Sequence, residues 1–153
     1  MKIIISPYSQ ILRNGKKNPK NYPYWKELVA ALQGDDIEII QIGRLDEERI
    51  DGVSDFLISL SMEELKKLIQ ESDLFFSVDN FFPHMAHFYG LRGVVLWGKS
   101  DPRIFGYKEN LNLYKDEKYF RPDQFGLWES CDYDEKAFLE PEFVLQHLEM
   151  VPV

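Results

Sequence analysis

Runs of apolar residues recur along the chain and predict strands. Five runs, at 2–7, 37–43, 55–60, 73–78 and 93–98, are rich in Ile, Val, Leu and Phe and are bounded by Gly, Pro, Ser, Asp or Asn, which is the pattern of β-strands. The last two are apolar at nearly every position. Such continuous runs are typical of central parallel strands that are covered on both faces.

Apolar residues recur at helical spacing between these runs. The segment 23–34 has Pro23 at its start and Gly34 just past its end, which are favoured positions for these residues at helix boundaries. Its apolar face comprises Trp25, Leu28, Val29 and Leu32. We therefore expect a helix that buries one side.

Three further helices are predicted. Ser61 and Glu64 have the spacing of a capping box, in which each side chain accepts a hydrogen bond from the other's backbone N–H. The apolar face of this second helix is expected to comprise Met62, Leu65, Leu68 and Ile69. A short helix is expected over 82–90, and a terminal helix over 140–150 that begins near Pro141.

The order of these elements predicts the fold class. Strands that alternate with helices indicate an α/β, Rossmann-like three-layer domain with a mostly parallel sheet, and we expect it to span 1–153 as a single domain. The long basic segment 8–22 is predicted to be a functional or mobile loop. The segment 110–114 is an edge strand or extended, and 114–133 is expected to be irregular.

Composition limits the partners and the compartment. The chain has 18 Lys and Arg against 26 Asp and Glu, a formal net charge of -8, which argues against nucleic acid and anionic membranes as partners. No apolar stretch is long enough for a membrane span, and the apolar start is too short for a signal peptide. Cys131 is the single cysteine and has no internal partner. We therefore expect the cytoplasm.

The loops that follow the predicted strands lie where α/β sheets bind ligands. Asp79 follows the strand 73–78, Gly98 ends the strand 93–98, and Pro7 opens the basic loop, so these loops converge if the strands are neighbours. Asn80 and the following residues open a helix whose N–H groups can receive phosphate. Counter-charge from the loop is available at Lys16, Lys17 and Lys20. The equally weighted alternative is that Asp79 or Asn80 only caps the helix and that the lysines only keep the loop soluble.

No catalytic motif accompanies these residues. The chain lacks a nucleophile elbow, a P-loop and a GxGxxG motif. His84 and His87 have no third ligand at a recognisable spacing, so no metal site is expected. His84 is predicted to form hydrogen bonds facing the strand ends, and His87 to be a surface or packing residue. Asp79 and Asp101 have no defined spacing as an acid/base pair, and the catalytic residue is unknown.

The run SDLFFSVDNFFPHMAHFYGLRGVVLWGKSDPRIFG, at 72–106, resembles the nucleotide-sugar site of glycosyltransferase family 9, the ADP-heptose:lipopolysaccharide heptosyltransferases. Two further segments, ISPYS at 5–9 and KNYPYWKELVAAL at 20–32, are similar to landmarks of the same family. The likeness covers nearly the whole chain, but only the second half of the family's protein. It implies the C-terminal, donor-binding half of a GT-B fold.

The resemblance implies a set of donor-binding residues. Lys20 matches the lysine that faces the donor diphosphate, and the remaining matched positions lie in two loops: Asp79, Asn80, His84, Gly98, Lys99, Ser100 and Asp101. Two replacements are visible. Asn80 and Phe81 stand where the family has Thr-Gly, and Lys99 and Ser100 stand where it has Pro-Thr.

The function implied is glycosyl transfer from a nucleoside diphosphate sugar of the ADP-heptose type, without a metal or other cofactor. An acceptor domain that carries the catalytic base would come from a second protein or from self-association. The alternative is a non-catalytic module, derived from such a domain, that binds a nucleotide-like ligand or a protein. Enzymatic activity of the chain by itself is left open.

Overall fold

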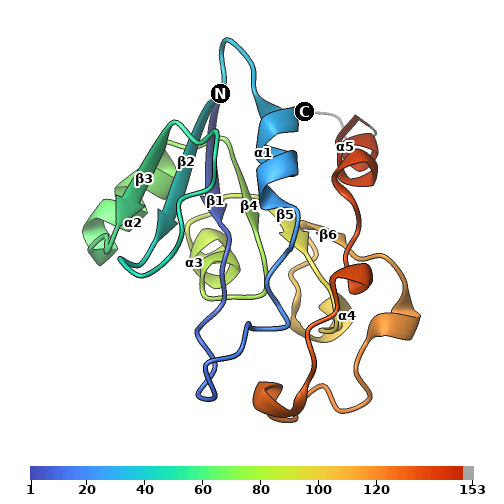
Figure 1. Ribbon diagram of the computed structural model, residues 1–153. Coiled ribbons are helices and arrows are strands. Elements are labelled where there is room, and N and C mark those ends of the chain that lie inside the picture. Colours follow the sequence, from blue (N-terminus) through green and yellow to red (C-terminus); the bar gives the residue numbers. More distant parts are fainter. Residues whose placement is uncertain (150–153) are drawn as a thin grey trace.

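A six-stranded parallel sheet runs through the computed structural model, which describes residues 1–149 (Figure 1). The strand order is β3-β2-β1-β4-β5-β6, and each neighbouring pair is parallel. The strands are β1 (Lys2–Ser6), β2 (Glu38–Gly43), β3 (Asp55–Ile58), β4 (Leu74–Ser77), β5 (Gly93–Leu96) and β6 (Leu111–Leu113). The α/β, Rossmann-like fold class and all five predicted strands are confirmed, and the segment 110–114 contains the parallel edge strand β6.

Helices cover both faces of this sheet. They are α1 (Trp25–Leu32), α2 (Met62–Gln70), α3 (Phe82–Phe88), α4 (Pro102–Phe105) and α5 (Pro141–Glu149). In Figure 1, α1 and α5 lie on one side of the sheet, and α2 and α3 lie on the other. The helix α5 begins at the predicted residue, and Met150 of its predicted span lies outside the described residues.

Short elements fill the segment expected to be irregular. The 3₁₀ turns η1 (Glu117–Tyr119) and η2 (Trp128–Ser130) lie within 114–133, and η3 (Glu135–Ala137) follows. The short helix α4 was not predicted. It has only four residues, too few for a helical apolar period to be visible in the sequence.

Alternation along β1 divides the core between the two faces. Ile3 and Ile5 pack with Leu28 of α1, whereas Ile4 packs with Leu65 of α2. Successive side chains of a strand point to opposite faces, so a strand covered on both sides is apolar at every position. Full burial of each such side chain stabilises the fold by about 1.5–3 kcal/mol.

The capping box of α2 is present, but its apolar face is shorter than predicted. Ser61 Oγ accepts a hydrogen bond from the Glu64 backbone N–H at 3.1 Å, and Glu64 Oε1 accepts one from Ser61 N–H at 3.1 Å. Leu65, Leu68 and Ile69 are buried. The prediction for Met62 was wrong: it is 60% exposed, because it begins the helix at the carboxyl edge of the sheet, beyond the core.

No helix among residues 1–149 is long and apolar enough to cross a membrane.

A buried amide holds the loop that follows β2. Gln41 is fully buried in that strand. Its Oε1 accepts a hydrogen bond from the Ile50 N–H at 2.8 Å, and its Nε2 donates one to the Glu48 carbonyl at 2.9 Å. Gln41 thereby fixes the return of the loop toward the sheet.

Replacing Gln41 with leucine removes both hydrogen bonds: the Ile50 N–H is left without a partner, and the Glu48 carbonyl keeps only its bond from the Tyr8 hydroxyl. We expect the Gln41→Leu variant to lose about 1–3 kcal/mol of unfolding free energy, because this is the cost of one unsatisfied buried group. Urea denaturation followed by circular dichroism measures this loss. Gln70→Leu is the matched control, since Gln70 is exposed on α2, and a loss of equal size in both variants would contradict the role of Gln41.

Candidate functional site

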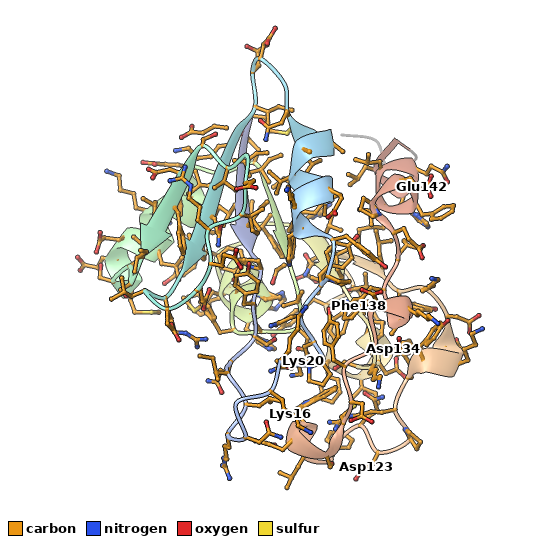
Figure 2. All side chains as sticks on the ribbon, viewed as in Figure 1. Lys16, Lys20, Asp123, Asp134, Phe138 and Glu142 are labelled. Carbon is orange, nitrogen blue, oxygen red and sulfur yellow. The ribbon has the colours of Figure 1, made fainter. Side chains whose placement is uncertain are left out.

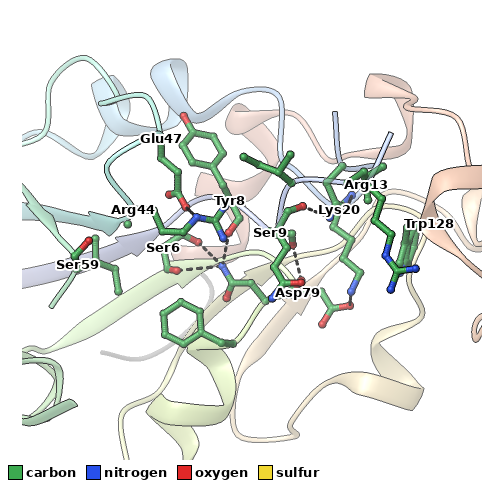
Figure 3. Close-up of a pocket in the computed structure, with 18 of the residues that line it drawn as sticks. Ser6, Tyr8, Ser9, Arg13, Lys20, Arg44, Glu47, Ser59, Asp79 and Trp128 are labelled. Carbon is green, nitrogen blue, oxygen red and sulfur yellow. Dashed lines mark hydrogen bonds and ion pairs between the residues drawn. The ribbon is translucent and has the colours of Figure 1, made fainter. Parts of the chain in front are cut away.

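A cavity of about 730 Å³ opens at the carboxyl ends of the first four strands (Figure 3). Its walls come from the loops that follow β1, β2, β3 and β4, together with the segment 126–129. The carboxyl edge is the place where open α/β sheets bind ligands, at the point where the strand order reverses. That reversal lies here between β1 and β4, so the cavity is the candidate site.

Asn80 forms the floor of the cavity and joins two strand ends. Its Nδ2 donates hydrogen bonds to the carbonyls of Ser6 at 3.2 Å and Tyr8 at 3.1 Å. Its Oδ1 accepts one from Phe82 N–H at 2.9 Å and another from Ser77 Oγ at 3.1 Å. Asn80 thus connects β1 with β4 and satisfies the N–H of the first residue of α3, although the N-cap position itself is Phe81.

Two of the predicted residues meet on one wall. Lys20 Nζ lies 3.0 Å from Asp79 Oδ2, and the two side chains are only 22% and 15% exposed. Ser9 Oγ donates a hydrogen bond to the Asp79 carbonyl at 2.7 Å. The structure therefore brings Lys20 and Asp79 together as an ion pair in which each neutralises the other.

An aromatic residue and a second cation lie beside this pair. Figure 3 shows Arg13, Lys20 and Trp128 on the same side of the cavity, and Lys20 Nζ lies 5.1 Å from the centre of the Trp128 ring. In Figure 2, Lys20 lies nearer to the sheet than Lys16, which is farther out on the same loop. Arg13 and Trp128 were not among the predicted site residues: only the lysines of the basic loop 8–22 were considered, and nothing in the sequence relates Trp128 to that loop.

Arg121 holds the segment that carries Trp128. Its guanidinium lies 3.4 Å from the centre of the Trp128 ring. It also donates hydrogen bonds to the carbonyls of Gln124, Gly126 and Leu127 at 3.2, 2.8 and 3.3 Å. These contacts give the segment 121–128 a defined path along the cavity.

The loop after β2 supplies a charged pair on the opposite wall. Arg44 Nε lies 3.2 Å from Glu47 Oε1, and the Glu47 carboxylate packs against Gly43, where an added Cβ would collide with it. Burial raises the pKa of Glu47, and the Arg44 charge opposes that rise. Sequence reasoning missed Glu47, although an acidic residue after the second strand is a recurrent ribose ligand in Rossmann folds.

Tyr8 lies beside this ion pair. Burial is the main reason that its pKa rises to about 12, with the charges of Glu48 and Glu47 adding to the effect. Its hydroxyl donates a hydrogen bond to the Glu48 carbonyl at 3.3 Å. Tyr8 is therefore a neutral hydrogen-bonding group at any physiological pH.

Apolar side chains line the remaining part of the cavity. They come from β2, β3, α2 and the loops just before α2 and α3: Ile42, Leu57, Leu60, Met62, Leu65 and Phe81. Met62 and Phe81 are 60% and 55% exposed, so they form the mouth. Next to them Ser59 has a φ of 54°, a left-handed conformation that costs a non-glycine residue about 1–3 kcal/mol and is found most often at functional sites.

The other five predicted residues do not line the cavity: His84, Gly98, Lys99, Ser100 and Asp101. His84 is exposed, and its Nδ1 lies 2.6 Å from the Tyr107 hydroxyl. At Gly98 an added Cβ would lie 2.6 Å from the Phe138 ring. Gly98 therefore permits the close packing of Phe138, which Figure 2 shows on the C-terminal segment beside the sheet.

The loop after β5 is engaged by its own neighbours. Lys99 Nζ donates a hydrogen bond to the Asp132 carbonyl at 2.6 Å, and Ser100 is buried with no partner for its Oγ among the described residues. Asp101 caps α4 and lies 2.9 Å from Arg103 Nη2. Hydrogen bonding by Arg103 lowers the pKa of Asp101.

His84 and His87 form a cluster with Tyr107 outside the cavity. His87 is exposed, as expected for a surface or packing residue. It stacks on the Tyr107 ring at 4.0 Å and contacts Glu109. Within residues 1–149 there is no group of three or more His, Cys, Asp or Glu side chains placed to hold a metal ion.

Replacing Asn80 with alanine tests its role as the connection between β1 and β4. We expect the Asn80→Ala variant to lose about 2–4 kcal/mol of unfolding free energy, because several hydrogen-bond partners at the strand ends are left unsatisfied. Chemical denaturation measures the change. Gln146→Ala, at an exposed position of α5, is the control, and an Asn80→Ala variant as stable as this control would contradict the assignment.

Comparisons with known proteins agree with the architecture. No family model and no curated protein matches the chain. Among solved structures, 97% of the chain superimposes on the ADP-heptose LPS heptosyltransferase II of E. coli, with a TM-score of 0.67 at 16% identity, and covers 45% of that protein. It likewise superimposes on E. coli heptosyltransferase WaaC with ADP, with a TM-score of 0.68 at 17% identity, 97% coverage of this chain and 43% of that protein.

A third similar structure belongs to the same broad class. The dodecameric iron-containing glycosyltransferase TibC of enterotoxigenic E. coli matches 92% of this chain and 36% of its own, with a TM-score of 0.63 at 16% identity. The chain spans less than half the length of each of these proteins. At such low identity the likeness establishes the architecture alone: the chain has a glycosyltransferase-like, Rossmann-type α/β fold.

Proposed function

We propose that this chain binds a nucleoside diphosphate sugar and serves as the donor-binding part of a glycosyltransferase. One observation carries the proposal. The cavity at the carboxyl edge joins an apolar part to a polar part that holds cations. A nucleotide sugar has a similar division, with the largely apolar faces of its base at one end and a charged diphosphate that links the ribose to the sugar.

The apolar part suits the base. Leu57, Leu60 and Met62 present aliphatic surface, and ligand pockets are lined mainly by such side chains with a few polar groups that set orientation. The cavity volume of about 730 Å³ lies within the usual range of about 300–1,000 Å³ for small-molecule sites. The Glu47 carboxylate also lines the cavity, beside Arg44, and can accept hydrogen bonds from ribose hydroxyls.

The polar part suits the diphosphate. Arg13 and Lys20 line it, together with the Ser9 hydroxyl. The chain as a whole is acidic, with a formal net charge of -8, so attraction of an anion depends on these local cations. In glycosyl transfer the same cations would stabilise the nucleoside diphosphate as it departs, and no metal ion is required for that step.

The acceptor and its catalytic base are proposed to come from elsewhere. Among the lining carboxylates, Glu47 is paired with Arg44 and Asp79 with Lys20, and Glu129 lies next to Trp128, on the side where we place the donor diphosphate. The heptosyltransferases that the chain resembles are more than twice as long as the part it matches. A further domain, a partner protein or a second copy would supply the base.

Isothermal titration calorimetry of the chain with nucleotides tests the proposal. We expect ADP and an ADP-sugar to bind with Kd values of about 1–100 μM, corresponding to about -8 to -5.5 kcal/mol, and adenosine to bind at least tenfold more weakly because it lacks the diphosphate. Titration with UDP tests whether the cavity prefers adenine to uracil. Absence of heat with every nucleotide at millimolar concentration would overturn the proposal.

Glu47→Gln tests the assignment of the ribose. A neutral amide accepts weaker hydrogen bonds than a carboxylate, so we expect the Kd for ADP to rise about tenfold, in line with about 1.5 kcal/mol for a hydrogen bond to a charged group. Calorimetry measures the change. Glu63→Gln is the control, because Glu63 is exposed on α2 and does not line the cavity. Equal affinities in the two variants would contradict a ribose contact.

A further inference from the structure

We infer that Arg13 is the principal phosphate-binding residue of the cavity, and that Asp79 opposes phosphate binding by occupying Lys20. The inference rests on the proposed function and assigns different roles to Arg13 and Lys20. Lys20 is the residue that the sequence resemblance places at the diphosphate. Because Lys20 is paired with Asp79 in the structure, we assign phosphate binding mainly to Arg13.

The ammonium of Lys20 already has an anionic partner. Its Nζ lies 3.0 Å from the Asp79 carboxylate, and both side chains are mostly buried. Screening by solvent is weaker for such a pair than for an exposed one, so the attraction within it is strong. A phosphate that approaches Lys20 must either displace the carboxylate or approach it closely, and the like charges then repel.

The third cation of the cavity is engaged in the same way. Arg44 Nε lies 3.2 Å from Glu47 Oε1 and 3.6 Å from Asp46 Oδ1. Its charge is therefore compensated on the wall where we place the ribose. Neither Arg44 nor Lys20 offers an unpaired charge to an incoming anion.

Arg13 differs from both. It lines the cavity and is exposed, and no residue among 1–149 forms an ion pair or a side-chain hydrogen bond with it. Figure 3 shows it beside Lys20 and Trp128. It is the only cation in the described cavity lining that is free of an acidic partner. A guanidinium presents planar, paired donors that match two oxygens of a phosphate.

The neighbouring lysines of the loop do not share this position. Lys16 and Lys17 do not line the cavity, and Lys17 lies 4.2 Å from the centre of the Tyr133 ring. Glu129 does line it, on the same side as Trp128, and adds negative charge there. With the Lys20 and Asp79 charges cancelling, attraction of a diphosphate depends on Arg13.

The experiment measures binding of inorganic pyrophosphate and of ADP to the full chain by calorimetry. We expect Arg13→Gln to raise both Kd values at least tenfold, and Arg13→Lys to raise them less, because the charge remains while the paired geometry is lost. Asp79→Asn is expected to lower both Kd values about three- to tenfold, since it frees Lys20 and removes a repelling charge. Lys16→Gln, on the same loop, is the control and should bind as the wild type does.

Each outcome decides a separate point. If the wild type binds ADP and Arg13→Gln binds it equally well, the inference fails while the proposed function stands. Weaker binding by Asp79→Asn would mean that Asp79 positions Lys20 for the ligand, which also overturns the inference. If pyrophosphate binds through Arg13 but ADP binds no more tightly, the inference holds and the nucleotide function fails. If neither pyrophosphate nor ADP binds, both the inference and the proposed function are overturned.

The Arg13 variants keep the test decisive if Asp79→Asn lowers the stability of the protein. Arg13 is exposed, and its side chain makes none of the hydrogen bonds or ion pairs that hold the described fold, so its replacement should leave the melting temperature unchanged. Thermal unfolding of each variant, followed by circular dichroism, verifies this before the titrations.

Discussion

The parallel pairing of β1 with β4 is the constraint on which the rest of the structure depends. From β1 the chain continues to β2 and β3 on one side, and from β4 it continues to β5 and β6 on the other. The connections that follow β1 and β4 therefore leave in different directions and open a crevice between them. Asn80 follows β4 and keeps this opening in place by donating hydrogen bonds to the carbonyls of Ser6 and Tyr8 at the end of β1. Without that contact the cavity would lack its floor.

Most of the fold could be predicted from the sequence because its strands are short, apolar and separated by helices with clear boundaries. The capping box predicted from Ser61 and Glu64 is present at the first turn of α2. The errors lie where local pattern and tertiary position disagree. Met62 is apolar at helical spacing yet lies outside the core, and α4 is too short to show a period.

The candidate site could be predicted only in part. The loops after β1 and β4 were correctly expected to converge, and they bring Lys20, Asp79 and Asn80 to one cavity. What the sequence does not show is pairing: that Asp79 neutralises Lys20, or that Glu47 folds back on Arg44. Trp128 comes from a segment without strand or helix periodicity, so its arrival at the cavity depends on tertiary contacts alone. The loop after β5, by contrast, is occupied with packing Phe138 and capping α4.

The wall that carries Trp128 also has a consequence for how the protein folds. It is attached to the first loop by hydrogen bonds from Asn14 to the Glu129 carbonyl and from Tyr133 to the Asn21 carbonyl, which join residues 115 and 112 positions apart. Contacts of such sequence separation form slowly, because a long stretch of chain must first be ordered. The sheet, whose neighbouring strands are closer in sequence, can form before them. We therefore expect the wall that carries Trp128 to complete the cavity only after the sheet has formed.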